Sequence, residues 1–260
     1  MLGSVDEGQN EVVIEPRRGK GEAPVPPGAL MGFTPMDLTL IRKTLGLGES
    51  PDRRVDLAKL WTCPSPWEGV VLAGPAMGAP AAALLLERLI ALGAKWVIGV
   101  GSCGSLQPDL TIGEVILPTG ALVEEGTSPH YLAPGVRTTP DAELLGALRD
   151  ALSASGVSPH EGRIWTTDAP FRETREKVIR YGRDGVLAVE METSALMTVA
   201  SFRRTPFASA LVVSDEIGGL RWKRGFESPG YLQGLARVAK VAVGVLSEKS
   251  REEAGRAEDR

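Results

Sequence analysis

The sequence predicts a single α/β domain with a central, partly parallel sheet that helices cover. Short apolar runs typical of buried strands alternate along the chain with longer runs typical of helices, which is the pattern of repeated strand–helix units. Between residues 30 and 247 no segment rich in Pro, Gly or Ser divides the chain. A chain of 260 residues, 43% of them hydrophobic, can bury a full-sized core.

Local signals place the individual elements. Residues 69–74 form an apolar run of strand type, and residues 79–93 form an Ala- and Leu-rich run that ends at a glycine, as helices do. Residues 95–101 predict the next buried strand. Residues 139–156 predict a helix with both ends marked, by Thr-Pro-Asp at the start and by glycine at the stop. Further strands are expected within 113–126, 162–168 and 207–215, and further helices within 191–203 and 229–249.

The two ends of the chain differ in composition from the domain between them. Residues 1–29 mix charge, Gly and Pro and predict an extended N-terminal arm, with a possible short strand at 11–15. Residues 248–260 are charged throughout and predict a frayed C-terminal tail. Residues 30–247 are left as the catalytic domain.

Composition excludes several functional classes. A formal net charge of -4 gives no general attraction for nucleic acid or for an anionic membrane surface. No apolar run approaches the ~20 residues that span a bilayer, and the N-terminus lacks the apolar core of a signal peptide. Cys63 and Cys103 lie far apart, which favours reduced thiols, and with two His in the chain no metal-ligand spacing is present. We expect a cytoplasmic enzyme without metal.

A glycine pattern raises the question of a nucleotide cofactor. Gly99, Gly101 and Gly104 have the G-x-G-x-x-G spacing of dinucleotide-binding loops. Such a loop must open directly into a helix, whose N-terminal amides hold the pyrophosphate, but Pro108 falls where the first turns would be. We therefore expect no nicotinamide or flavin cofactor. The stretch predicts a tight turn at the end of a strand, in which Ser102 and bare amides could hold a small polar ligand; a turn without any ligand is the alternative.

Four stretches together carry a family resemblance: residues 93–132 with "VGSCGSLQP", 165–174 with "TTDAPFRET", 186–202 with "VEMET", and 211–216 with "VVSDE". In this order they resemble the superfamily of purine nucleoside phosphorylases, uridine phosphorylases and methylthioadenosine nucleosidases. The resemblance covers roughly residues 30–247. It implies one α/β domain with a mixed, barrel-like sheet, a homo-oligomer (hexamer or dimer), and cleavage of the N-glycosidic bond of a small-molecule nucleoside.

The resemblance also implies roles for individual residues. Cleavage passes through a ribosyl cation-like state, so the enzyme must assist the departing base and hold the ribose. Asp215 matches the acid that protonates or hydrogen-bonds purine N7, with Ser214 beside it; a helix N-cap formed by this pair is the alternative. Glu192 matches the carboxylate that accepts hydrogen bonds from the ribose hydroxyls, and Met191 matches a residue that lines the sugar. Glu190, two residues earlier, is expected to be structural.

Other candidate substrate contacts follow from the same match. Phe171 falls in the segment that covers the base, where an aromatic ring can stack on it, although a core residue is the alternative for a lone Phe. Asp168 is a candidate for a contact with base or sugar. Met77, Gly101 and Ser102 complete the predicted substrate-binding set, in which the Gly101–Ser102 segment positions the nucleophile or its anion.

One departure from the family pattern concerns the base. Uridine-specific members have a Gln and an Arg, two residues apart, where this chain has Thr174 and Glu176. These two side chains cannot present the same paired edge to uracil. With Asp215 in place, the sequence favours a purine-type base.

A second departure concerns the acceptor that attacks C1′. Gly99 stands where phosphorolytic members have a phosphate-binding arginine, and Asp37 falls on a second arginine position when Pro35 is aligned with the family proline. Each lost charged hydrogen bond is worth roughly 1.5–3 kcal/mol, and a carboxylate near the anion adds repulsion. The sequence therefore favours hydrolysis, with Asp37 holding or activating a water. A phosphorylase that uses inorganic phosphate and other arginines is one alternative, and a non-catalytic nucleoside-binding protein is another.

Overall fold

The computed structural model describes residues 12–133 and 137–258, and its strands form one ten-stranded mixed sheet. The strand order is β10-β9-β6-β7-β8-β5-β1-β4-β3-β2. The strands are β1 (Gly28–Gly32), β2 (Arg53–Val55), β3 (Ala58–Thr62), β4 (Val70–Gly74), β5 (Trp96–Ser105), β6 (Val115–Glu124), β7 (His160–Thr167), β8 (Ala188–Glu190), β9 (Phe207–Glu216) and β10 (Lys223–Arg224). The predicted α/β class with a partly parallel sheet is confirmed.

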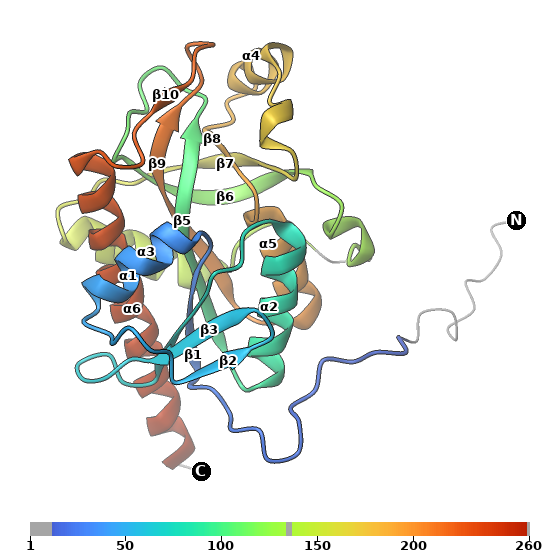
Figure 1. Cartoon of the computed structure of the whole chain (residues 1–260), viewed down its shortest axis with the longest axis vertical. Coiled ribbons are helices and arrows are strands. Elements are labelled where there is room, and N and C mark those ends of the chain that lie inside the picture. Colours follow the sequence, from blue (N-terminus) through green and yellow to red (C-terminus); the bar gives the residue numbers. More distant parts are fainter. Residues whose placement is uncertain (1–11, 134–136, 259–260) are drawn as a thin grey trace, which may run out of the picture.

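Strand β5 closes part of this sheet on itself. It pairs with β1 and β9 in parallel and with β8 in antiparallel fashion, while β9, β6, β7 and β8 are neighbours in turn. Strands β9, β6, β7, β8 and β5 therefore form a closed ring, and β1, β4, β3 and β2 extend from it (Figure 1). This is the barrel-like sheet that the resemblance implied. Because β5 and β9 run in parallel, their carboxyl ends meet at one edge of the ring.

Helices cover both faces of the sheet (Figure 1). One apolar cluster packs α2 and α5 against it, and a second packs α1, α3 and α6. The helices are α1 (Pro35–Thr44), α2 (Ala79–Ala91), α3 (Ala142–Ala154), α4 (Arg175–Arg183), α5 (Thr193–Arg203) and α6 (Pro229–Glu258), with short 3-10 turns η2 (Ser128–His130) and η3 (Pro170–Arg172). No helix in the described ranges is long and apolar enough to cross a membrane.

The glycine-rich stretch is part of strand β5, so the predicted turn there is wrong. A Cβ atom at Gly99 would lie 2.7 Å from Cζ of Phe33, and one at Gly101 would lie 2.5 Å from its Cδ2. The two glycines thus make room for the buried ring of Phe33. The residues that follow Ser105 form turns that lead into β6.

The ends of the chain also differ from expectation. Residues 12–15 form no strand, and residue 11, with the rest of the arm before it, lies outside the described residues. Strand β1 begins at Gly28, inside the predicted arm. Helix α6 continues to Glu258, so the prediction of a frayed tail is wrong for the part that the structure describes. The expected domain limits of 30–247 otherwise stay a prediction.

Candidate active site

A cavity of about 490 Å³ lies at the carboxyl ends of β5, β8 and β9. Strand β5 contributes Ser102, Cys103 and Gly104 to its lining, and β9 contributes Ser214 and Asp215. The rest of the lining comes from the segments before α1 and before α2, from β8 and the residues after it, from η3 and α4, and from the loops on either side of β10. Ligands of α/β proteins commonly bind outside the carboxyl ends of parallel strands, so the position itself indicates a site.

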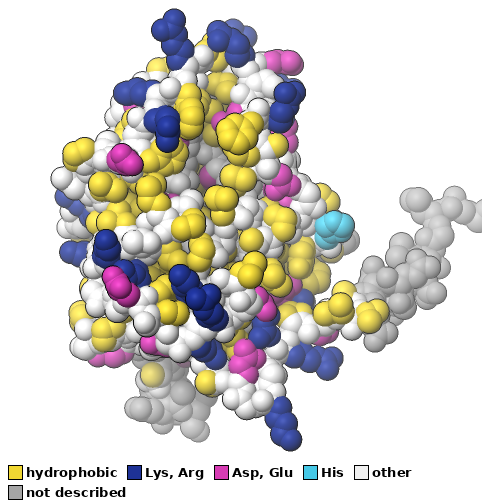
Figure 2. All heavy atoms as spheres, in the orientation of Figure 1, with side chains coloured by type: hydrophobic (Ala, Val, Ile, Leu, Met, Phe, Trp, Pro, Cys, Tyr) yellow, Lys and Arg dark blue, Asp and Glu magenta, His cyan; other side chains and the backbone are white. Residues whose placement is uncertain are grey.

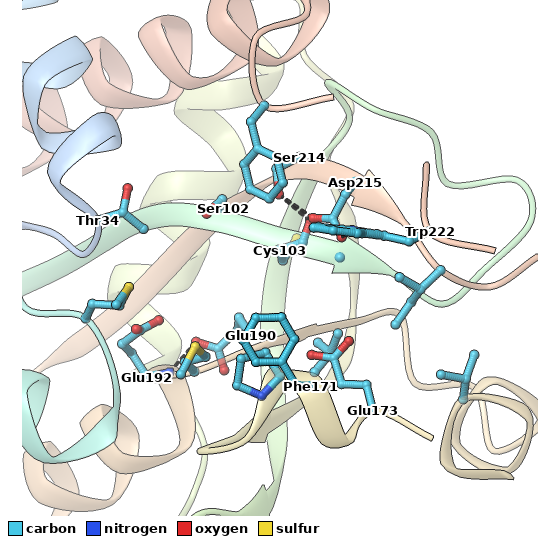
Figure 3. Close-up of a pocket in the computed structure, with 18 of the residues that line it drawn as sticks. Thr34, Ser102, Cys103, Phe171, Glu173, Glu190, Glu192, Ser214, Asp215 and Trp222 are labelled. Carbon is cyan, nitrogen blue, oxygen red and sulfur yellow. Dashed lines mark hydrogen bonds between the residues drawn. The ribbon is translucent and has the colours of Figure 1, made fainter. Parts of the chain in front are cut away.

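Predicted ribose-binding residues line one end of the cavity (Figure 3). Glu192 is only 4% exposed, and the backbone N–H of Gly78 donates a hydrogen bond of 2.6 Å to its Oε1. Burial, followed by the charge of Glu190, raises the pKa of Glu192 to about 8. Met77 and Met191 lie in the same lining. The structure thus brings together Glu192 and Met191, the two residues predicted for the sugar, with Met77 of the predicted substrate-binding set.

Glu190 has the structural role that the sequence predicted, although it also lines the cavity. Its Oε2 accepts the backbone N–H groups of Glu192 and Thr193 at 2.8 and 2.7 Å, at the start of α5. These amides have no partner within the helix, so the carboxylate satisfies them. Thr166 of β7 donates its hydroxyl to the other oxygen. Burial raises the pKa of Glu190.

Asp215 stands near the end of β9 with both carboxylate oxygens engaged (Figure 3). Ser214 Oγ donates to Oδ1 at 2.7 Å, and the indole N–H of Trp222 donates to Oδ2 at 2.8 Å. A Cβ at Gly104 would lie 3.1 Å from Oδ2, so the third glycine of the β5 pattern lets the carboxylate approach the strand. Because β9 continues through Glu216, the alternative of a helix N-cap at Ser214–Asp215 is wrong.

The far end of the cavity holds aromatic and charged side chains. Phe171, in η3, lines the cavity but is 96% exposed, so its predicted place near a base is compatible with stacking and a core role is excluded. Glu173 lies two residues on, and sequence reasoning missed it as well as Trp222. Burial, and then the charge of Asp215, raises the pKa of Glu173 to about 7. Arg175 and Arg221 line this same end.

The surface around the cavity is apolar in its middle and basic at one end. Figure 2 shows hydrophobic side chains gathered across the middle of this face, and Lys and Arg side chains where α4 and β10 lie. Met77 and Trp222 are 59% and 58% exposed although both line the cavity. An open, apolar rim suits a flat aromatic ligand.

Asp37 lies behind the cavity wall, in the first turn of α1, with 0% exposure. The hydroxyl of Tyr231, from α6, donates to its Oδ1, and Ser102 Oγ lies 3.3 Å from its Oδ2. Burial raises the pKa of Asp37, in spite of these donors. The residue therefore reaches the cavity through Ser102, which lines it. Tyr231 is a further residue that the sequence did not single out.

Two predicted contacts lie elsewhere. Asp168 does not line the cavity; its Oδ2 accepts the backbone N–H of Gly126 at 2.8 Å, so it fixes a loop. Gly101 is not part of the lining either, and a Cβ there would lie 2.5 Å from the ring of Phe33, so its predicted contact with the substrate stays a prediction. Within the described residues no group of three or more His, Cys, Asp or Glu is placed to hold a metal ion.

The fold and the cavity, with its carboxyl and aromatic lining, define an α/β enzyme-like domain with a site for a small molecule. The family profile described as "Phosphorylase superfamily" matches residues 58–242, and the chain belongs to this family. The resemblance inferred from the motifs is thus confirmed.

Individual relatives sharpen the comparison. "Purine nucleoside phosphorylase DeoD-type" of Bacillus cereus (strain B4264) and of Bacillus thuringiensis (strain Al Hakam) are each 36% identical over 151 residues, which is 57% of this chain. The match spans 64% of each relative, somewhat less than two thirds of its length.

Solved structures share the fold at low sequence identity. Uridine phosphorylase from Vibrio fischeri ES114 superimposes with a TM-score of 0.76 at 21% identity, covering 89% of this chain and 98% of its own. Purine nucleoside phosphorylase from Toxoplasma gondii, in complex with immucillin-H, gives a TM-score of 0.79 at 18% identity, covering 93% and 100%. At such identities the likeness establishes the architecture alone.

Proposed function

We propose that this protein is an enzyme that cleaves the N-glycosidic bond of a purine-type nucleoside. The observation that carries the proposal is that Asp215 and Glu192, the two carboxyl residues matched to base and ribose, line one cavity. Breaking the bond leaves negative charge on the base and positive charge on the sugar, and groups at both ends are needed to stabilise that separation. The names of the DeoD-type relatives support a purine as the base.

Each lining residue has a part in this proposal. Glu192 accepts hydrogen bonds from the ribose hydroxyls, while Met77 and Met191 pack on the sugar ring. Phe171 covers one face of the base, and Asp215, with its neighbour Ser214, contacts the base edge. Nucleoside and acceptor are the only reactants, and no organic cofactor enters.

For the acceptor, the comparisons favour inorganic phosphate. The family profile is described as a phosphorylase superfamily, and the named relatives are phosphorylases. Both descriptions support phosphorolysis over the hydrolysis that the sequence favoured. Ser102, in the lining, offers a hydroxyl to a bound anion at the end of the cavity near Thr34. We therefore propose phosphorolysis, with the base and a sugar 1-phosphate as products.

Hydrolysis stays the second candidate, because of one specific observation. The carboxyl of Asp37 lies 3.3 Å from Ser102 Oγ, and Phe33 occupies the space in front of Gly99, so a guanidinium has no room there. The arginines of this chain that line the cavity, Arg175 and Arg221, belong to its other end. A phosphate dianion near Asp37 would need a cation from outside this wall.

A nucleoside panel distinguishes these reactions. Inosine, adenosine, methylthioadenosine and uridine are incubated with the protein in 50 mM phosphate and in phosphate-free buffer, and free base and sugar products are followed. Turnover only with phosphate, yielding a sugar 1-phosphate, supports phosphorolysis. Equal rates yielding free sugar establish hydrolysis. Ligand-induced thermal stabilisation without any product would indicate a nucleoside-binding protein and overturn the enzymatic proposal.

Assembly and location follow from the same proposal. A homo-oligomer and a cytoplasmic location stay predictions from the sequence and its resemblance. Sedimentation of the purified protein tests the first.

A further inference from the structure

Glu173 is the carboxyl residue of the cavity that has no assigned role. It lies between η3 and α4, and its side chain points into the cavity opposite Asp215 and Trp222 (Figure 3). Within the described residues, its carboxyl makes no hydrogen bond and no ion pair. Arg175, which lines the cavity two residues further on, donates to the backbone oxygen of Leu220 instead.

The two carboxyl groups at the base end of the cavity therefore differ in their surroundings. Asp215 accepts hydrogen bonds on both oxygens, from Ser214 and from the donor-only indole of Trp222. Glu173 has no such donor, is partly shielded from water, and faces the charge of Asp215. When two carboxyl groups flank a reacting ligand and their surroundings differ in this way, one acts as acid and the other stays an acceptor.

We propose that Glu173 donates the proton to the leaving base, while Asp215 orients the base as a hydrogen-bond acceptor. This inference rests on the proposed nucleoside cleavage and changes its assignment of the acid. As the C1′–N9 bond breaks, its electron pair passes to the base, and the Glu173 proton moves to a ring nitrogen of the base. The acceptor oxygen, of phosphate or of water, forms the new bond to C1′ and loses a proton to solvent. Glu173 then takes a proton back from solvent.

Surrounding charges are consistent with this role. Besides Asp215 from β9, the charged groups lining this end are Arg175 from α4 and Arg221 from the loop before β10. Glu190 and Glu192 lie toward the ribose end (Figure 3). Burial and Asp215 raise the pKa of Glu173 to about 7, so a proton is available near neutral pH.

A pair of substrates isolates the proton donor. Inosine needs a proton on its departing base, whereas the base of 7-methylguanosine already carries a positive charge and leaves without one. We expect Glu173→Gln to lower kcat/KM for inosine by roughly 10²–10⁴-fold and to leave 7-methylguanosine nearly unchanged. For the wild type, kcat/KM with inosine should fall as the pH rises through about 7, and this limb should be absent with 7-methylguanosine.

Control variants separate chemistry from folding. Glu173→Asp keeps a carboxylic acid at this position and should recover part of the kcat/KM for inosine. Glu176 is exposed on α4 and lies outside the cavity lining, so Glu176→Gln should leave kcat/KM unchanged for both substrates. Thermal melting of each variant checks that the protein is folded. Equal losses on both substrates, or no loss on inosine, would overturn the assignment of Glu173 while leaving the proposed function intact. If the wild type cleaves neither nucleoside, the proposed function fails and this inference fails with it.

Discussion

Replacing Glu192 by Gln should make the stability of this protein much less sensitive to pH. The carboxyl of Glu192 is buried next to Glu190, and its pKa rises from an ordinary value of 4.5 to about 8. Between these two values the folded state holds a proton that the unfolded state has lost. Stability from this group is therefore full below pH 4.5 and is lost as the pH rises through about 8.

The size of the effect follows from the shift. One pKa unit corresponds to about 1.4 kcal/mol, so the penalty on folding grows from about 1 kcal/mol at pH 5 to about 5 kcal/mol at pH 9. A glutamine at this position does not titrate, and its oxygen can still accept the N–H of Gly78. The variant should gain on the order of 4 kcal/mol relative to the wild type between pH 5 and pH 9.

Urea denaturation at pH 5, 7 and 9 measures this difference directly. Glu176→Gln, an exposed carboxyl change, serves as the matched control and should follow the wild type. In separate samples without urea, nucleoside binding by Glu192→Gln should be weakened most at pH 9, where the wild-type carboxyl is ionised and the variant lacks this charged acceptor for the ribose hydroxyls. If the free energy of unfolding changes by the same amount in variant and wild type between pH 5 and pH 9, the reasoning is refuted.

Three further substitutions test contacts described above. Trp222→Phe keeps the ring and removes the indole N–H that Asp215 accepts; we expect kcat/KM to fall about tenfold, with the melting temperature unchanged, and an unchanged kcat/KM would contradict a positioning role. Tyr231→Phe removes the phenol hydroxyl that donates to buried Asp37, and we expect the free energy of unfolding to fall by about 1–3 kcal/mol. A variant as stable as the wild type at pH 7 would show that this hydrogen bond does not stabilise the fold. Gly101→Ala places a Cβ 2.5 Å from the ring of Phe33 and should lower the free energy of unfolding by about 1–3 kcal/mol, with partial recovery when combined with Phe33→Leu; no loss in the single variant would mean that the ring moves freely.

The sequence predicted those parts of the fold that local periodicity determines. Strand β4 and helices α2, α3 and α5 fall where apolar runs, caps and glycine stops indicated. The glycine pattern of β5 was misjudged, because glycines that serve a turn and glycines that admit a neighbouring ring look alike until Phe33 is placed. The tail of α6 was misjudged because a charged run can continue a helix whose earlier turns pack well.

The candidate site divides in the same way. Asp215, Glu192 and Met191 sit in short motifs, and a resemblance can identify them. The resemblance could not identify Trp222 and Tyr231, because their contacts with carboxylates form only when the chain folds. The loop after β9 brings the indole of Trp222 to Asp215, and α6 brings the phenol of Tyr231 to Asp37. Glu173 offered a weaker signal, since it lies within the matched segment at 165–174.

The outermost strands of the sheet bear on how copies of the protein can associate. The strand order leaves β2 and β10 at its two margins, and these are the short segments Arg-Arg-Val and Lys-Arg. Short edge strands with positive charges are poor templates for a strand from another molecule. They offer few free backbone N–H and C=O groups, and their positive side chains repel the same side chains of a second copy. Any assembly that includes this sheet should therefore be built by packing of side chains and helices, and continuation of the sheet across molecules is disfavoured.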